Sequence, residues 1–353
     1  MNQTLDLSNW SCPIPLRDYP RIVLGHGGGG QLTAELIEHL FLPAFHNPVL
    51  AGMADAAIIP APKGRMAFTT DSFVVQPLFF PGGSIGSIAV NGTVNDLAMC
   101  GAKPLYLSAG FILEEGLPLE TLARVLHQMA EAAQAAEVCI IAGDTKVVEK
   151  GHGDGIFIAT TGIGEVPEGI CLGMTQVVPG DVVIVSGTIG DHGMAVMSVR
   201  ENLQFSTLIE SDCAALHPLV DAMLQYDPSA VHMLRDPTRG GVATVLNEIA
   251  QSSKMGIILD EDMLPVKDEV QAACELLGLD PLFVANEGKL LAIVASNAAE
   301  FLLNTMRAHP LGKEAAIIGR VTLDHPGMLV SKTSIGGTRV IAMQIGEQLP
   351  RIC

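Results

Sequence analysis

The chain has 353 residues, more than one hydrophobic core usually organises, so we expect two domains. Apolar residues make up 48% of the sequence and charged residues 16%, a composition that excludes an intrinsically disordered chain. Twenty Lys and Arg against 38 Asp and Glu give a formal net charge of −18. So negative a surface disfavours general binding to DNA, RNA or anionic membranes.

The sequence also indicates the compartment. No stretch reaches the roughly 18–20 uninterrupted apolar residues that a spanning helix needs, and residues 1–20 contain no run typical of a signal peptide. The seven cysteines are odd in number, scattered and never in a CxxC pair, which argues against a disulfide framework and a structural zinc site. We therefore expect a cytoplasmic protein.

The first half of the chain alternates short apolar runs with helical patterns. Residues 1–20 are expected to be an irregular extension, before a glycine run and a helix in which Leu32, Leu36 and Leu40 share one face. Short apolar runs typical of strands then occur at 56–59, 66–70, 105–109, 138–142 and 156–160, with a helical pattern over 119–133 between them. Strands interleaved with helices indicate an α/β or α+β domain.

A second series of elements begins after a stretch rich in Pro, Gly and polar residues at 166–180. It contains a buried strand at 181–187, helices at 216–225 and 242–251, and apolar runs at 256–259, 290–295, 315–318 and 339–343. We place the domain boundary near residue 172, so the expected domains are 21–172 and 173–343. The last ten residues, 344–353, are predicted to be a mobile tail because they contain Gly346 and Pro350.

Aspartates at the edges of short apolar runs, beside small residues, are the most informative feature: they are Asp55, Asp71, Asp96, Asp144 and Asp236. Carboxylates at strand ends can converge on one cleft, where Mg²⁺ bridges them to phosphate oxygens. The metal would reverse the local sign of charge and so permit nucleotide binding by an acidic protein. Alternatively, an Asp in such a place caps a helix or begins a turn.

The glycine run from Gly25 to Gly30 precedes the first helical pattern. Backbone N–H groups there could cradle a phosphate at the helix N-terminus, and the candidates are Gly27, Gly28, Gly29 and Gly30. No Gly-Lys-Ser/Thr follows, so this is not a Walker A loop, and no clear strand precedes it as in a dinucleotide-binding motif. The alternative is a flexible loop without a ligand, in which His26 is an ordinary loop residue.

Cysteine is the last residue of the chain. An exposed terminal thiol is open to oxidation and contributes no packing, so the presence of Cys353 invites an explanation. Ten extended residues span at most roughly 33–36 Å, which would let the sulfur enter the molecule's own cleft or another protein's. A few per cent thiolate at neutral pH is enough for acyl capture if a base assists. A terminal cysteine also occurs by chance.

Several segments together resemble the HypE family of hydrogenase maturation proteins. They are residues 70–83 (TDSFVVQPLFFPGG), 91–98 (NGTVNDLA), 143–149 (GDTKVVE), 186–193 (SGTIGDHG), 235–241 (RDPTRGG) and the closing 350–353 (PRIC). The similarity runs from about Gly25 to Cys353, and several long motifs in order make it specific. Residues 1–20 lie outside it.

The resemblance implies a fold and an activity. It implies a two-domain α/β protein of the superfamily of aminoimidazole ribonucleotide synthetase and selenophosphate synthetase (PurM-like), with ATP and Mg²⁺ in a cleft. Such proteins receive a carbamoyl group on the terminal cysteine from HypF and use ATP to dehydrate the thiocarboxamide to a thiocyanate. The cyano group then passes to iron on the HypC–HypD scaffold. A homodimer through the N-terminal halves is also implied.

Roles for single residues follow from the resemblance. Asp55, Asp71, Asp96 and Asp144 are the implied metal and phosphate ligands, and Asn91 and Asp236 join the nucleotide-binding candidates. Around Cys353, three residues are implied to act in catalysis: Lys146 stabilises charge on the transferred phosphoryl group, Glu287 is the base, and His152 orients substrate or shuttles protons. Alternatively, Lys146 is a surface lysine paired with Glu149, Glu287 a helix-end carboxylate, and His152 a solvent-exposed loop residue.

Two other functions are compatible with this sequence. One is a different ATP-using enzyme of the same superfamily that acts on a free small molecule, such as a ribonucleotide or selenide. The other is a non-catalytic thiol carrier whose nucleotide site only controls partner docking. Deletion of Cys353 tests the first alternative, because an enzyme that acts on a free small molecule would keep its turnover and a dehydratase would lose it. The mass of the carbamoylated protein after incubation with Mg-ATP tests the second, because a carrier would keep its mass and a dehydratase would lose one water mass.

Overall fold

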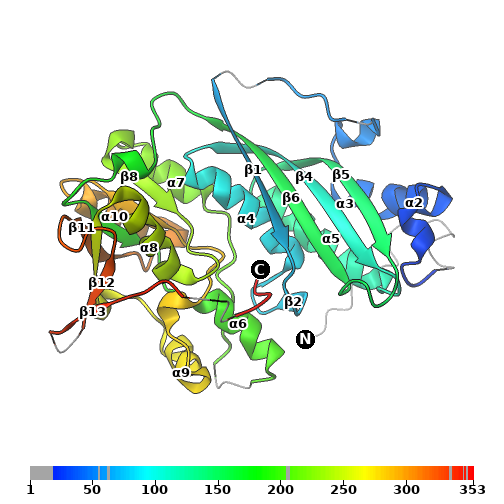
Figure 1. Ribbon diagram of the computed structural model, residues 1–353. Helices are drawn as coiled ribbons and strands as arrows, with labels where there is room; N and C mark the ends of the chain where they lie inside the picture. Colours follow the sequence, from blue (N-terminus) through cyan, green and yellow to red (C-terminus); the bar gives the residue numbers. More distant parts are fainter. Residues whose placement is uncertain are drawn as a thin grey trace.

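The computed structural model describes residues 19–54, 56–61, 64–203, 207–333, 336–344, 346 and 349–353. Two β-sheets, each with its own helices, divide these residues into an N-terminal and a C-terminal half (Figure 1). The mixed helix-and-sheet class expected from the sequence is thus confirmed. Within the described ranges, no helix combines the length and apolar character needed to cross a membrane.

The N-terminal half begins with the glycine run and a short helical segment. The 3₁₀ turn η2 (Leu24–Gly27) leads into α2 (Gln31–Leu36), which continues as the π-helical η3 (Ile37–Phe41) and then α3 (Leu42–Ala44). The expected helix is therefore present. Its apolar face, with Leu36 and Leu40 buried, packs on the core of this half.

The N-terminal sheet has four strands in the order β1-β6-β4-β5: β1 (Arg65–Phe73), β6 (Ile156–Val166), β4 (Lys103–Glu114) and β5 (Cys139–Val148). The pairs β1–β6 and β6–β4 are antiparallel, whereas β4–β5 is parallel. Thus β1 and β5 form opposite edges (Figure 1). The run at 56–59 forms no strand, and Ile58 is 90% exposed.

Two helices, α4 (Ile85–Met99) and α5 (Leu119–Ala135), cover one face of this sheet (Figure 1). The small hairpin of β2 (Phe79–Phe80) and β3 (Gly83–Ser84) leads into α4, which begins at a reciprocal cap. Ser84 N–H donates to Ser87 Oγ at 2.8 Å, and Ser87 N–H donates to Ser84 Oγ at 3.3 Å. Because almost every residue of α4 is buried, its polar side chains are held rigidly.

None of the helices in the described part of the chain covers the opposite face of the N-terminal sheet. Along β1 the side chains alternate, so that Met66 and Phe68 are exposed while Phe73 is buried under α4. The register β1–β6–β4 puts Ile112 on the same exposed face. We call the strand face bearing Met66, Phe68 and Ile112 the open face.

The C-terminal half is a three-layer structure. Its sheet has the order β13-β12-β9-β11-β7-β10-β8, with β7 (Val182–Val185), β8 (Val231–Arg235), β9 (Gly256–Asp260), β10 (Leu291–Val294), β11 (Ala316–Thr322), β12 (Leu329–Lys332) and β13 (Thr338–Val340). One face packs on α7 (His217–Leu224) and α10 (Ala299–Ala308), and the other on α8 (Gly241–Ser253).

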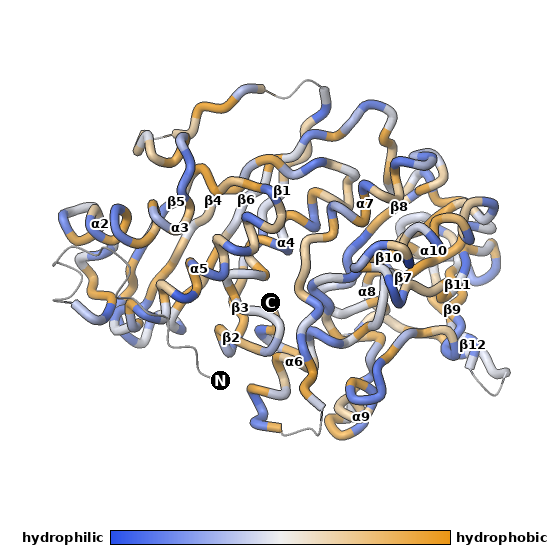
Figure 2. Tube along the Cα trace, turned by 180° about the vertical axis from the view of Figure 1, so that it is seen from behind, coloured by the Kyte–Doolittle hydropathy of each residue, from blue (hydrophilic) through white to orange (hydrophobic). Residues whose placement is uncertain are grey.

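Two further helices, α6 (Asp191–Arg200) and α9 (Asp268–Leu277), pack against the core of the N-terminal half instead. The last residues of the chain join the same apolar cluster, with Leu349 and Ile352 both buried. In two views from opposite sides, the C-terminus lies between the N-terminal sheet and α6 (Figures 1 and 2). Both halves therefore surround the end of the chain.

Candidate functional site

The glycine run packs tightly on β5. An added Cβ at Gly27 would lie 2.4 Å from the backbone nitrogen of Val147, so only glycine fits. Thr33 of α2 ties the loop together: its Oγ1 donates to the carbonyl of His26 at 2.9 Å and accepts from Gly29 N–H at 3.0 Å. His26 is buried and accepts Val23 N–H on Nδ1, which fits the alternative of a structural loop histidine.

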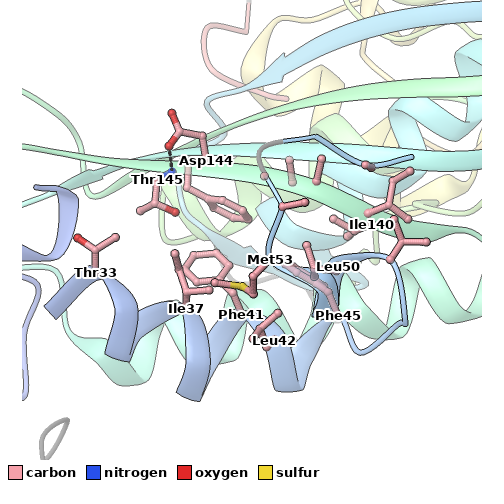
Figure 3. A pocket seen from close by; sticks show the side chains of 18 of the residues that line it. Thr33, Ile37, Phe41, Leu42, Phe45, Leu50, Met53, Ile140, Asp144 and Thr145 are labelled. Carbon is pink, nitrogen blue, oxygen red and sulfur yellow. Dashed lines mark hydrogen bonds between the residues drawn. The ribbon is translucent and has the colours of Figure 1, made fainter. Parts of the chain in front are cut away.

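Beside this loop is a cavity of about 280 Å³ (Figure 3). Its walls are mostly apolar and come from the first helical segment, the residues that follow it up to Met53, and β5: they include Ile37, Phe41, Phe45, Leu50, Met53 and Ile140. Gly27, Gly29 and Thr33 lie at one end, and Asp144, Thr145 and Lys146 also line the cavity. An apolar pocket with polar groups at its rim is typical of a small-ligand site.

Asp144 and Lys146 are ion-paired on β5, with Lys146 Nζ 2.7 Å from Asp144 Oδ1. Both side chains are largely exposed, and Thr145 N–H also donates to Asp144 at 2.8 Å. The hydrogen bond from Lys146 lowers the pKa of Asp144, so this carboxyl is ionised at neutral pH. The partner of Lys146 is thus Asp144 rather than the Glu149 of the surface alternative.

A second group of candidates lies between the two halves. Asp71 on β1, Asp96 on α4 and Asp236 after β8 are close enough to influence one another's ionisation. Asp96 Oδ2 accepts a hydrogen bond from Thr69 Oγ1 at 2.8 Å. Asp96 and Asp236 line a cavity of about 750 Å³ together with Arg235 and Arg239. We call Asp71, Asp96 and Asp236 the acidic cluster.

Each carboxyl of the acidic cluster holds its proton more tightly than usual. Burial raises the pKa values of Asp71 and Asp96, and burial together with the charge of Asp96 raises that of Asp236 to about 7. The charges of Arg235 and Arg239 act in the opposite direction without cancelling this effect. The acidic cluster therefore has an excess of negative charge that a bound cation would relieve.

Glu287 lies at the edge of the acidic cluster, in the segment between η8 (Pro281–Phe283) and β10. It is 3% exposed, and its Oε1 has no hydrogen-bond partner among the described residues. Burial, followed by the charges of Asp212 and the acidic cluster, raises its pKa well above the ordinary value. Glu287 is a buried carboxyl outside any helix, so the helix-end alternative is wrong.

The backbone around Glu287 is fixed by Asp212 and Asn95. Glu287 N–H donates to Asp212 Oδ1 at 3.0 Å, and Asn95 Nδ2 donates to the carbonyls of Ala214 and Glu287 at 3.0 and 3.3 Å. At Gly288 an added Cβ would lie 1.7 Å from the carbonyl oxygen of Asp212. This close approach requires glycine and brings the segment with Asp212 against the candidate base.

Only some of the four aspartates predicted as Mg²⁺ ligands lie where they could bind one ion. No three acidic, histidine or cysteine side chains among the described residues are arranged closely enough to hold an ion by themselves. Asp71 and Asp96 nevertheless supply hard oxygen ligands in a region of unbalanced negative charge, which suits Mg²⁺ completed by phosphate oxygens. Asp144 lies on the other edge strand, and Asp55 lies outside the described residues.

The end of the chain is docked beside β1. Val74 N–H donates to a terminal carboxylate oxygen of Cys353 at 3.0 Å, and Gln76 N–H donates to the carbonyl of Arg351 at 3.2 Å, as in a short antiparallel pairing. Arg351 also donates from Nε to the carbonyl of Val74 at 3.0 Å. The segment expected to be a mobile tail therefore has a defined packed position at residues 349–353.

His152 lies in the turn between β5 and β6 and is exposed, as its loop alternative supposed. Glu114 of β4 accepts N–H bonds from Gly151 and Gly155 at 2.6 and 2.9 Å, which fixes that turn. Asp154 in the same turn is ion-paired with Arg351. The turn that carries His152 is thus linked to the docked tail.

The structure brings some predicted residues together and separates others. Asp71, Asp96, Asp236 and Glu287 share one region, whereas Gly27 to Gly30, Asp144 and Lys146 form a second region. Asn91 on α4 donates to the sulfur of Cys213 at 3.2 Å and is largely buried. Sequence reasoning missed Thr69, Asp212, Arg235 and Arg239; the two arginines lie within a motif already singled out, but Asp212 has no such signal.

Comparisons with known proteins give the family of this chain. Residues 53–166 match the family model "AIR synthase related protein, N-terminal domain", and residues 178–330 match that of the C-terminal domain. A carbamoyl dehydratase HypE from Cupriavidus necator is 57% identical over 334 residues, which are 94% of this chain and 95% of the relative. The chain belongs to the HypE family.

Solved structures of HypE proteins are similar throughout. A crystal structure of HypE in complex with ATP has a TM-score of 0.90 and 46% identity, covering 94% of this chain and 99% of the other. A HypE–HypF complex contains a chain with a TM-score of 0.77 and 51% identity, covering 88% of this chain and 99% of the other. The resemblance drawn from the sequence motifs is confirmed.

Proposed function

We propose that this protein is an ATP-dependent carbamoyl dehydratase that carries its substrate on its own terminal cysteine. The observation that carries the proposal is the hydrogen bond that Val74 N–H, three residues beyond Asp71 of the acidic cluster, donates to a terminal carboxylate oxygen of Cys353. It holds the terminal residue between the two halves of the molecule. The ATP complex of a HypE relative supports the choice of nucleotide.

The chemistry needs two steps. An amide oxygen is a poor leaving group, so the γ-phosphoryl group of ATP is first transferred to the oxygen of the thiocarboxamide on Cys353. ADP leaves and the nitrogen loses one of its two protons, which gives S–C(=NH)–O–phosphate. Removal of the remaining N–H proton then expels phosphate and leaves S–C≡N. Loss of phosphate in place of water lets ATP hydrolysis drive the dehydration. The first step requires neutralised phosphates and in-line positioning, and the second requires a base near the nitrogen.

Different residues of the chain serve the two steps. Asp71 and Asp96 would hold Mg²⁺, which neutralises phosphate charge when bound. Glu287 accepts the amide proton, because a buried carboxylate with a raised pKa is a stronger base than an exposed one. Its Oε1, which accepts no hydrogen bond from the residues that the structure describes, is available to an N–H donor. Lys146 stabilises charge on the transferred phosphoryl group, and His152 orients the substrate or transfers protons.

We propose that the nucleotide site needs a second copy of the chain. The glycine loop, Asp144 and Lys146 lie at the β5 edge of the sheet, while Asp71 lies on β1 at the opposite edge. The exposed apolar side chains of the open face favour a homodimer through that face. A two-fold axis along the strands would then bring the β5 edge of one copy over the β1 edge of the other.

Mixing two inactive variants tests the shared site. Asp96→Asn and Asp144→Asn should each weaken Mg-ATP binding, and mixed dimers should regain one intact site of two. Random mixing makes about half of the dimers mixed, so up to about a quarter of wild-type activity returns. Activity that stays absent in mixtures with verified exchange of subunits would place the whole site within one chain.

Intact mass tests the reaction itself. The carbamoylated protein incubated with Mg-ATP should lose one water mass, and a variant that lacks Cys353 should bind nucleotide but form no product. An unchanged mass would favour the nucleotide-controlled thiol carrier. Turnover of a free small substrate without Cys353 would favour another enzyme of the superfamily.

The partners follow from the same chemistry. We propose a HypF carbamoyltransferase as the donor, since a complex of the two proteins is known for a relative with 51% identity. The HypC–HypD scaffold is proposed as the acceptor of the cyano group. The unpaired cysteines at the surface, Cys100, Cys139 and Cys171, favour the reducing cytoplasm.

A further inference from the structure

Helix α6 carries an arginine that binds the backbone of the docked tail. Arg200, its last residue, donates from Nη1 to the carbonyl of Pro350 at 2.7 Å and from Nη2 to that of Arg351 at 2.6 Å. The same guanidinium donates to the carbonyl of Gln76, at 2.9 Å from Nε and 2.5 Å from Nη2. One planar group therefore joins the tail to the segment that pairs with it.

The first turn of the same helix holds the next peptide group. His192 is fully buried, with Nε2 2.8 Å from the carbonyl oxygen of Ile352 and Nδ1 2.8 Å from Ser211 Oγ. A carbonyl oxygen only accepts, so Nε2 carries the proton and the hydroxyl of Ser211 donates to Nδ1. Burial lowers the pKa of His192, which favours the neutral ring that this pattern requires.

The histidine is in turn oriented from the segment that supports Glu287. Ser211 Oγ accepts the backbone N–H of Cys213 at 3.2 Å, and Asp212 between them accepts the backbone N–H of Glu287 at 3.0 Å. The carbonyl of Ile352 belongs to the peptide group directly before Cys353. Hydrogen bonds, together with the covalent chain at residues 211–213, thus connect the backbone next to the reactive residue with that of the proposed base.

We propose that α6 is a receptor for the backbone of the C-terminal tail, in which His192 and Arg200 are positioning residues for Cys353. Both bind main-chain carbonyls, of Pro350, Arg351 and Ile352, so they fix the path of the chain without touching the sulfur. The ion pair of Arg351 with Asp154 and the pairing with Val74 complete the dock.

The role of this receptor in catalysis rests on the proposed function. A sulfur that is loaded by another protein and then modified within its own molecule must leave and return. Breaking the contacts to α6 should therefore favour the released tail: the sulfur becomes more accessible to an external reagent, and the internal ATP-dependent step slows. A general loss of folding would also raise access and slow dehydration, so both changes count only in a variant that melts and binds Mg-ATP like wild type.

Alkylation of Cys353 by iodoacetamide measures release of the tail in the full-length protein. Digestion after glutamate yields a peptide of residues 348–353, whose mass reports this cysteine alone. Removing an arginine that makes charge-assisted bonds to three carbonyls should raise the alkylation rate in Arg200→Ala by about tenfold or more. Hydrogen exchange at the amides of Val74 and Gln76, which bind the tail, should rise in parallel.

Matched variants test whether a change in the alkylation rate is specific to the contacts between α6 and the tail. Arg320→Ala removes an exposed arginine of β11 and should leave the rate unchanged, while Arg200→Lys, with fewer donors, should lie between. His192→Gln keeps a donor for the carbonyl of Ile352 and should stay near wild type, whereas His192→Leu should raise the rate. Melting temperature and binding of Mg-ATP confirm folding, and if either His192 variant fails to fold, the Arg200 series decides.

An alkylation rate and amide exchange in Arg200→Ala equal to those of Arg320→Ala would overturn the proposal. Equal rates in folded His192→Leu and His192→Gln would remove His192 from the receptor. Neither measurement involves the carbamoyl group. If dehydration itself were wrongly assigned, the carbamoylated wild type would keep its mass with Mg-ATP while the order of alkylation rates stood.

Discussion

The glycine run offers a sharp test of the nucleotide-binding loop, because its members are not equivalent. A Cβ at Gly27 would lie 2.4 Å from the nitrogen of Val147, roughly 1 Å short of ordinary contact. Backbone cannot move aside as a flexible side chain does, so the loop must shift away from β5. Overpacking of this kind costs about 1–3 kcal/mol, which corresponds to about 5- to 150-fold in affinity if binding requires the native loop.

Gly28 provides the matched control for Gly27→Ala. Its φ is −91°, and the nearest atom to an added Cβ is 3.7 Å away, so Gly28→Ala should bind nucleotide like wild type. Gly29→Ala should be intermediate, since a φ of +77° costs a non-glycine residue about 1–2 kcal/mol.

Calorimetry with Mg²⁺ and a non-hydrolysable ATP analogue measures the three affinities, and thermal unfolding separates loss of binding from loss of stability. Wild-type affinity in Gly27→Ala, or an equal loss in Gly28→Ala, would refute the assignment of this loop.

Three other changes probe the acidic cluster, the base and the open face. Glu287→Gln should slow dehydration by about 10²–10⁴-fold while nucleotide still binds, and the wild-type rate should rise with pH through the raised pKa of Glu287; a pH-independent rate contradicts its role. The pKa of Asp236 is about 7 against 3.8 unfolded, so the native state holds this proton more tightly and loses stability as pH rises between these values. Asp236→Asn should therefore melt higher than wild type at pH 8 without metal but not at pH 3, and equal melting curves at pH 8 contradict this. Phe68→Glu should give monomers in sedimentation, whereas Leu208→Glu, an equally exposed control outside the open face, should not.

Helix α4 shows where sequence periodicity fails. Residues 85–99 contain Gly86, Gly92, Asn91 and Asn95, which are poor helix formers, and the helix is buried on almost all sides, so no amphipathic stripe reveals it. α5 has a regular apolar face and was predicted correctly over 119–133. Helix α4, which positions Asp96, could therefore not be predicted from its sequence, because it is buried on almost all sides as well as poor in helix-forming residues.

The candidate site was predictable as a set of residues but not as an arrangement. The aspartates were expected to converge because carboxylates at strand ends can meet in one cleft. Asp71 instead lies within β1 and Asp144 within β5, on opposite edges of a mixed sheet, and strand order is not visible in the sequence. The role of Glu287 came from motif resemblance, while its burial and its contact with Asp212 required the structure.

The docking of the tail is hidden from sequence for another reason. Arg200 and His192 recognise carbonyl groups, which every residue possesses, so no side-chain pattern at residues 350–352 announces the contact. Only the three-dimensional path of the chain reveals it.

The docked tail touches Gln76 and Asp154 in one half of the molecule and α6 in the other. The tail that carries Cys353 therefore also connects the two halves, and its release removes these contacts. By thermodynamic reciprocity, a nucleotide that binds more tightly when the tail is docked strengthens retention of the tail by the same factor. The position of the tail and the occupancy of the nucleotide site are then coupled, so a protein that binds the released tail also weakens nucleotide binding.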